Sequence, residues 1–195
     1  VAPRAANAAG LTAPDAVYRR TGWWSASGLP LQHIAWLRQF RPAVFSAAER
    51  FVFVADFVLR RLTGEYVADP SNAAITMLYD VGGQDWSDEL LATAGITRAR
   101  LSPLAPSGAA IGRVLPDAAR ELGLPPGVLA VNGAHDQYCA ALGAGVIHAG
   151  DTLVGSGTAW VLLFAADRPL FDAGQVFHPG PHVTAGLWGA LSSIP

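Results

Sequence analysis

An aspartate follows a short apolar segment in the second half of the chain. Residues 128–131 read Val-Leu-Ala-Val between two glycine-containing stretches, a pattern that predicts a buried strand. Asp136 stands between this strand and a helix predicted over 137–144, and open α/β sheets bind their ligands at such strand ends. Its carboxylate could accept a proton from a bound hydroxyl as a general base. The alternative is an N-cap of the helix, and the two roles are compatible. His135 could orient Asp136 or tune its pKa, or it could be a buried, hydrogen-bonded turn residue.

A glycine-rich turn follows at residues 155–158, with the sequence Gly-Ser-Gly-Thr. The backbone N–H groups and hydroxyls of Ser156, Gly157 and Thr158 could surround phosphate oxygens. The turn is not a Walker A loop, because it has no lysine. It is also not a nucleophile elbow, because Val154 and Thr158 occupy the positions where that motif needs glycine. The alternative is an ordinary hairpin turn between apolar segments at 151–154 and 159–164.

Two histidines, His178 and His182, lie four positions apart, but Pro-Gly-Pro separates them. No helix can place both on one face across that segment, because proline interrupts helices. We therefore predict a loop here and no metal site.

Other side chains that could do chemistry have simpler explanations. Cys139 lies on a helix of small residues and is expected to be a packed, apolar thiol. Trp23, Trp24 and Trp36 could stack on the face of a sugar, although core packing is the commoner use of tryptophan.

Composition excludes several classes of protein. Among 195 residues, 51% are hydrophobic and 14% are charged, which excludes a disordered chain. The net charge is -2 and no basic stripe is present, so we expect neither a nucleic-acid partner nor an anionic membrane surface. All 13 basic residues are arginine, which excludes a lysine Schiff base, and the single cysteine excludes a disulfide scaffold. No apolar run reaches the ~20 residues of a membrane span, and no signal peptide opens the chain, so we expect a cytoplasmic protein.

The elements that must position these residues are those of an α/β protein. Helical patterns cover 31–40, 87–94 and 116–122, and a turn is predicted at 69–72. The stretch 46–62 allows two interpretations. One is a single helix that starts at a capping box of Ser46 and Glu49. The other is a helix, a β-prone segment at 51–54, and a shorter helix capped by Asp56.

Taken together, these segments resemble the FGGY family of carbohydrate kinases. Eight matches run in order over roughly 21–165. They are, in chain order, 21–22 with 36–38 (T-G, W-L-R), 41–45 (R-P-A-V-F), 56–65 (D-F-V-L-R-R-L-T-G-E), 69–76 (D-P-S-N-A-A-I-T), 123–127 (G-L-P-P-G), 133–137 (G-A-H-D-Q), 141–146 (A-L-G-A-G-V) and 150–159, which ends in G-T-A.

The resemblance implies an actin-like or ribonuclease H-like ATPase fold and an ATP-dependent sugar or polyol kinase that uses Mg²⁺. Asp136 matches the family's general base, and His135 and Gln137 beside it are expected to contact the sugar hydroxyls. Ser156, Gly157 and Thr158 match the family's second phosphate-binding loop. Residues 1–148 correspond to the later part of the sugar-binding domain, and residues 149–195 correspond to the start of the ATP-binding domain. A homodimer of the full-length protein is also expected.

The chain departs from the family pattern in ways that suggest a central fragment. The family's opening D-x-G-T segment, which binds phosphate and Mg²⁺, and its later Gly-Gly-Gly adenosine segment have no counterpart here. His33 stands where many members have lysine, and Ala159 stands where many have serine. We therefore expect this chain to be inactive alone. The alternatives are a kinase-derived, non-catalytic binding or regulatory module and an actin- or chaperone-like ATPase, and the sugar-lobe motifs favour the kinase over the ATPase.

Overall fold

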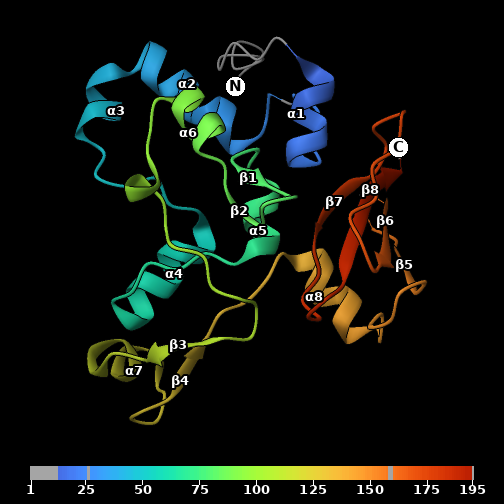
Figure 1. Cartoon of the computed structure of the whole chain (residues 1–195). Coiled ribbons are helices and arrows are strands. Elements are labelled where there is room, and N and C mark those ends of the chain that lie inside the picture. Colours follow the sequence, from blue (N-terminus) through green and yellow to red (C-terminus); the bar gives the residue numbers. More distant parts are fainter. Residues whose placement is uncertain (1–12, 26, 158–159, 195) are drawn as a thin grey trace.

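The computed structural model describes residues 13–25, 27–157 and 160–194. Figure 1 shows a mainly helical part that contains the elements before α8, and a four-stranded sheet beside it that contains the elements after α8. The helices are α1 (Pro14–Thr21), α2 (Pro30–Phe40), α3 (Pro42–Ala47), α4 (Val54–Thr63), α5 (Pro70–Ala74), α6 (Asp88–Ala94), α7 (Pro116–Leu122) and α8 (Asp136–Gly143), with a 3₁₀ turn at Arg98–Arg100. The strands are β1 (Tyr79–Asp80), β2 (Asp85–Trp86), β3 (Ala110–Arg113), β4 (Leu129–Val131), β5 (Thr152–Gly155), β6 (Trp160–Ala166), β7 (His178–Pro181) and β8 (Trp188–Ile194).

Proline and glycine set the ends of several helices. Helices α1, α2, α3, α5 and α7 begin on proline, whose fixed φ suits the first helical position and whose missing N–H is not needed there. Helices α1, α4, α6 and α7 end at glycines with left-handed backbone. The predicted helix over 87–94 is confirmed as α6. Its N-cap is Ser87, whose hydroxyl accepts a hydrogen bond from the Leu90 N–H at 3.5 Å.

The stretch 46–62 follows the second interpretation in outline, because a helix, an extended segment and a second helix with Asp56 in its first turn succeed one another. Pro42 starts α3, which places Ser46 inside that helix, so the capping box at 46–49 was wrong. An extended segment without strand pairing follows, and α4 then begins at Val54. Asp56 does act near the start of α4, because its carboxylate accepts a hydrogen bond from the Phe53 N–H at 3.4 Å.

The largest hydrophobic core of the described residues lies within the helical part, between α2, α5, α6 and the β1–β2 ribbon. Leu31, Met77, Leu78 and Leu91 are almost fully buried in it. Burial of this apolar surface is the main term that holds these short elements together.

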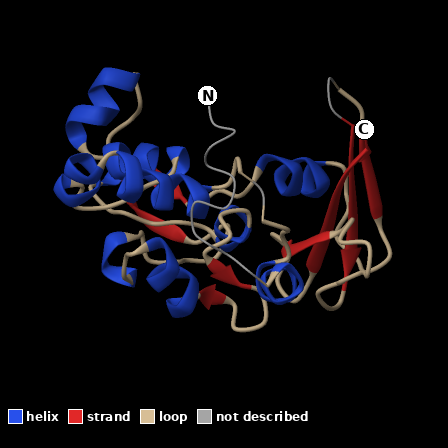
Figure 2. Ribbon diagram, turned by 90° about the horizontal axis from the view of Figure 1, so that it is seen from above, coloured by secondary structure: helices blue, strands red, loops and turns tan. Residues whose placement is uncertain are grey.

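The sheet carries the glycine turn. Its strand order is β5-β6-β8-β7, and neighbouring strands are antiparallel. The predicted hairpin around residues 155–158 is confirmed by the pairing of β5 with β6. Helix α8 packs on one face through a second core that includes Tyr138, Ala141 and Leu163. Figure 2 shows the sheet at one side of the molecule and most helices at the other.

The strand predicted at 128–131 is confirmed as β4 but not its burial, and the loop predicted between His178 and His182 was wrong. The segment 128–131 contains β4, but Leu129 is 53% exposed and Val131 is 48% exposed, so the strand is not buried. Among the described residues, strand β4 pairs only with β3 in a two-stranded ribbon, which leaves one face open to solvent. The segment 178–181 is not a loop but the edge strand β7, because it pairs with β8. Among the described residues, no helix combines the length and apolar character needed to cross a bilayer.

Candidate functional site

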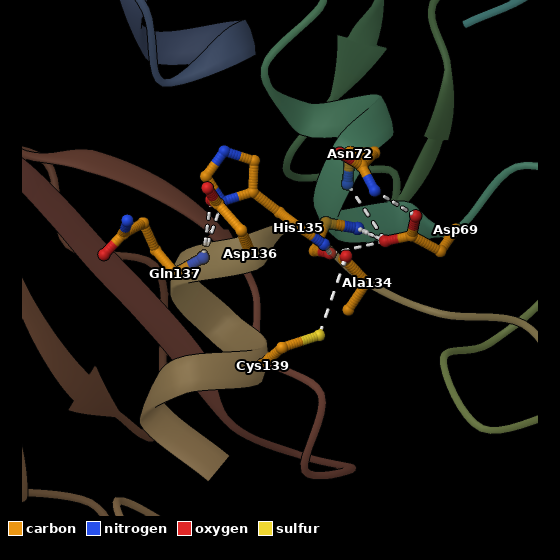
Figure 3. Close-up of polar contacts among 8 residues, drawn as sticks. Asp69, Asn72, Ala134, His135, Asp136, Gln137 and Cys139 are labelled. Atoms are coloured by element: carbon orange, nitrogen blue, oxygen red, sulfur yellow. Dashed lines mark hydrogen bonds and ion pairs between the residues drawn. The ribbon is translucent and has the colours of Figure 1, made fainter. Parts of the chain in front are cut away.

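Asp136 occupies the first position of α8, with its side chain 80% exposed. The N-cap is His135 rather than Asp136. Nδ1 of His135 accepts a hydrogen bond from the Gln137 N–H at 3.3 Å, and Oδ1 of Asp136 accepts from the same N–H at 2.7 Å (Figure 3). The predicted N-cap role of Asp136 was therefore wrong, because α8 begins at Asp136 and His135 caps it. One carboxylate oxygen of Asp136 remains without a partner among the described residues, as a general base requires.

A buried carboxylate anchors the turn that presents Asp136. Oδ1 of Asp69 accepts hydrogen bonds from the N–H groups of Ser71 at 2.9 Å and Asn72 at 3.0 Å, and Oδ2 accepts from Nδ2 of Asn72 at 2.6 Å. The Ser71 hydroxyl donates to Asp69 and accepts from the His135 N–H at 2.9 Å. The start of α5 is thereby bonded to the start of α8 (Figure 3). The sequence predicts a turn at 69–72 and a family match there, but it does not reveal the contact with His135, which spans 64 residues of chain.

Gln137 connects α8 to the glycine turn. A Cβ atom added at Gly155 would lie 3.5 Å from Oε1 of Gln137, so this side chain lies against the end of β5. Ser156 and Gly157 are exposed beyond that strand. Of the predicted site residues, the structure brings Gln137, next to Asp136 in sequence, against the start of the glycine turn. Thr158 lies outside the described residues.

Two tryptophans and His178 form a further cluster, which the sequence did not reveal. The ring of His178 stacks flat on Trp23 at 4.0 Å between centroids and meets Trp24 at 4.4 Å. Nδ1 of His178 lies 3.0 Å from the carbonyl oxygen of Gly22, which can only accept, so Nδ1 donates. Burial lowers the pKa of His178, so the ring is neutral and Nε2 is a hydrogen-bond acceptor.

This cluster borders a hollow of about 350 Å³ whose lining includes Trp24, Gln175, His178 and Ser193, and no charged residue. Trp24 is 41% exposed, so its ring is accessible to a ligand. Trp36 instead packs against Phe40 and Arg41 on α2. The aromatic surface available near the site is therefore that of Trp24.

The hollow and Gly155 lie at the same end of the sheet. Gly155 pairs with Val161, and Val161 pairs with Ser193, so these residues form one row across β5, β6 and β8. Two strand spacings, about 10 Å, separate the backbones of Gly155 and Ser193. Gln137 lies against Gly155, so the residue after Asp136 and the hollow border the two ends of this row.

Two remaining predictions concern sulfur and metals. Cys139 is exposed rather than packed, because α8 turns Tyr138 and Ala141 toward the sheet and leaves Cys139 on the other face. Its thiol lies 3.6 Å from the carbonyl oxygen of Ala134. Within residues 13–25, 27–157 and 160–194, no three histidine, cysteine or acidic side chains gather as metal ligands.

Comparison with known structures shows the fold. The crystal structure of xylulose kinase from Rhodospirillum rubrum matches with a TM-score of 0.90 and 27% identity, over 98% of this chain and 39% of that one. Plasmodium falciparum glycerol kinase with ADP matches at TM-score 0.87 and 15% identity, over 98% of this chain and 40% of that one. The predicted α/β, actin-like or ribonuclease H-like fold is thereby confirmed, and the chain represents a part of it.

Sequence comparison identifies the family. The autoinducer-2 kinase of Yersinia pestis (strain Pestoides F) is 35% identical over 177 residues, which are 90% of this chain and 33% of that protein. The chain thus spans about a third of the length of the curated relatives it matches. The model of the FGGY family of carbohydrate kinases, N-terminal domain, matches residues 5–143. The chain therefore belongs to the FGGY family of carbohydrate kinases.

Proposed function

We propose that the protein containing this chain transfers the γ-phosphoryl group of ATP to a hydroxyl of a sugar or polyol. The main support is the position of Asp136, which presents an exposed carboxylate at the end of the sheet where the glycine turn lies. Family membership makes phosphoryl transfer the chemistry to expect there. Autoinducer-2, xylulose, gluconate and glycerol are the acceptors named for similar proteins, and they define the candidates.

In the proposed mechanism, a substrate hydroxyl donates a hydrogen bond to the free oxygen of Asp136. As the hydroxyl oxygen attacks the γ-phosphorus, its proton passes to the carboxylate, the bond to the β,γ-bridging oxygen breaks, and ADP leaves. The backbone N–H groups of Ser156, Gly157 and Thr158 would bind phosphate oxygens. Gln137 and His135 would contact other hydroxyls of the acceptor. Phosphoryl transfer depends mainly on positioning and electrostatics, so the relative placement of base and turn is decisive.

The use of Mg²⁺ is proposed only because the resemblance to the kinase family implies it. The described residues do not bring together three side chains that could hold the ion. The donor set of this part of the chain therefore does not fit a complete Mg²⁺ site, and we derive no step through the metal.

The proposal extends to the organisation of the protein. Residues 1–148 would belong to the sugar-binding domain and residues 149–195 to the start of the ATP-binding domain. Because the chain spans about a third of its relatives, we propose that it does not turn over alone. A cytoplasmic location and a homodimer of the full-length kinase remain predictions.

A coupled ADP-release assay tests the function. The full-length protein that carries this chain is screened with ATP against pentuloses, hexuloses, polyols, glycerol, gluconate and autoinducer-2. Sugar-dependent ADP release is the expected result. Binding of an acceptor without ADP release by the full-length protein would instead support a kinase-derived binding module.

The glycine turn provides a first prediction. Gly157→Val places a branched side chain on an exposed turn where phosphate must approach the backbone. We expect the KM for ATP to rise about tenfold or more while the KM for the acceptor changes little. Gly112→Val is the matched control, since a Cβ at Gly112 on β3 meets nothing within 4 Å. Equal effects of the two variants on the KM for ATP would contradict the phosphate-binding role.

The exposed ring of Trp24 provides a second prediction. Trp24→Ala removes the aromatic wall of the hollow beside His178, so the KM for the acceptor should rise roughly fivefold, since stacking contributes about 1 kcal/mol. The KM for ATP should stay unchanged. Trp36→Ala, on α2, is the control and should leave both KM values near wild type. Steady-state kinetics with each substrate varied in turn measure the difference, and a shift in the KM for ATP alone would refute this placement.

A further inference from the structure

The ring of Tyr138 lies on a seat formed by two glycines of the sheet. Gly180 of β7 and Gly189 of β8 are directly paired. A Cβ atom at Gly189 would lie 2.8 Å from Cζ of Tyr138, and one at Gly180 would lie 2.8 Å from the Tyr138 hydroxyl oxygen. Packed carbon atoms do not approach so closely, so the ring requires both positions to lack a side chain.

Shape, rather than hydrogen bonding, holds the ring there. Tyr138 is 2% exposed, and its hydroxyl donates to the Gly189 carbonyl over a long 3.3 Å. His135 and His182 meet the ring in edge-to-face contacts, at 6.0 Å and 5.7 Å between centroids. Because a rigid ring in a close-packed seat cannot slide, α8 has one favoured position over the sheet.

The seat lies at the junction of the two parts of the molecule. A Cβ atom at Gly180 would also lie 3.3 Å from Cβ of Ala74, so α5 packs on the same point. Figure 1 shows α8 next to α5 and to the lower end of β7. Movement of the ring would therefore move α8 relative to both α5 and the sheet.

Tyr138 follows Asp136 by two residues in the first turn of α8. Gln137, between them, lies against Gly155. The height of the first turn over the sheet therefore sets the distance from the Asp136 carboxylate to the glycine turn.

We propose that Tyr138 is a positioning residue for phosphoryl transfer, and that its ring, on the Gly180–Gly189 seat, holds Asp136 at the correct distance from the glycine turn. The inference rests on the proposed kinase function. A displacement of about 1 Å can lower a rate about 100-fold, because reacting groups must be close and aligned. Tyr138 touches neither substrate in this role and acts only through the placement of Asp136.

The test is a rescue experiment in the full-length kinase, with ATP and the most active acceptor of the panel. Gly189→Ala should lift the ring and lower kcat about 100-fold, while both KM values change less than about twofold. Tyr138→Phe keeps the ring and should retain kcat within about twofold. The double variant Gly189→Ala/Tyr138→Leu makes room for the new methyl group and should recover about tenfold or more in kcat relative to Gly189→Ala. Gly143→Ala on α8, where a Cβ meets nothing, is the control.

Amide chemical shifts of Gln137 and Gly155 provide a readout that does not depend on catalysis. They should move in Gly189→Ala and return toward wild type in the double variant. A Gly189→Ala protein with a lowered Tm but an unchanged kcat would overturn the proposal, as would a double variant no better than Gly189→Ala. If Gly189→Ala fails to fold, the single variants of Tyr138 decide. A low kcat for Tyr138→Leu together with a normal kcat for Tyr138→Phe supports the proposal, and equal kcat values for the two variants refute it. If the wild-type protein shows no turnover, the proposed function fails, while the amide shifts still decide whether the seat positions α8.

Discussion

Replacing Asp136 by asparagine in a full-length kinase that carries this chain should lower kcat by about 10²–10⁴-fold. Asparagine has nearly the same shape and can still accept the hydrogen bond from the Gln137 N–H, but its amide cannot take the proton of an attacking hydroxyl. The KM for ATP should change less than about twofold, because in the proposed site the glycine turn, not Asp136, binds the phosphates. Steady-state ADP release with both substrates varied measures these effects.

The exposure of Asp136 keeps this test free of folding effects. With 80% of its side chain in solvent, Asp136 contributes little to stability, so the Tm of Asp136→Asn should match that of wild type. Asp117→Asn is the matched control, because Asp117 is an equally exposed carboxylate in the first turn of another helix, α7. We expect that variant to keep wild-type kcat. An Asp136→Asn enzyme with wild-type turnover would remove Asp136 from the role of base.

Local signals in the sequence were sufficient to predict the bounds of a helix that has capping residues at both ends. Helix α6 has Ser87 before it and Gly95 after it, so its bounds could be predicted. Strand β7 has no such signal, because Pro179 and Pro181 predict a loop and only pairing with β8 makes the segment a strand. The exposure of β4 likewise depends on the absence of a second strand partner, which no local pattern encodes.

The candidate site also contains some residues that the local sequence indicates and some contacts that it does not. Asp136 and the glycine turn lie on one predicted strand–helix–hairpin unit, so local patterns offered them as candidates, whereas Gln137 was named only through the resemblance to the kinase family. The contact of Ser71 with His135, and the stack of Trp23 on His178, join segments far apart in the chain. Such pairs depend on the packing of whole elements, so composition and spacing could not reveal them.

Asp69→Ala should be the most destabilising change near the site. Loss of an N-cap destabilises a helix by about 0.5–2 kcal/mol. Asp69 is 2% exposed, so its removal also leaves the buried donors of Ser71 and the half-buried donors of Asn72 without partners, at about 1–3 kcal/mol for each group that water cannot reach. We therefore expect the free energy of unfolding to fall by roughly 3 kcal/mol. Chemical denaturation of this chain measures it directly.

Asp80→Ala is a stringent control for that prediction. Asp80 forms the same kind of turn, since its Oδ1 accepts hydrogen bonds from the N–H groups of Gly82 at 2.9 Å and Gly83 at 3.0 Å, but these bonds are exposed. Water can replace them, so Asp80→Ala should lower the free energy of unfolding by about 1 kcal/mol or less.

Ser71→Ala separates stability from function, because the Asp69 carboxylate still caps α5 while the bond to the His135 N–H is lost. This variant should be more stable than Asp69→Ala. Both variants should lower kcat in the full-length kinase, because each breaks the hydrogen-bonded connection from Asp69 through Ser71 to the His135 N–H. Equal destabilisation by Asp69→Ala and Asp80→Ala, or normal turnover of Ser71→Ala, would show that the buried carboxylate does not anchor the turn carrying Asp136.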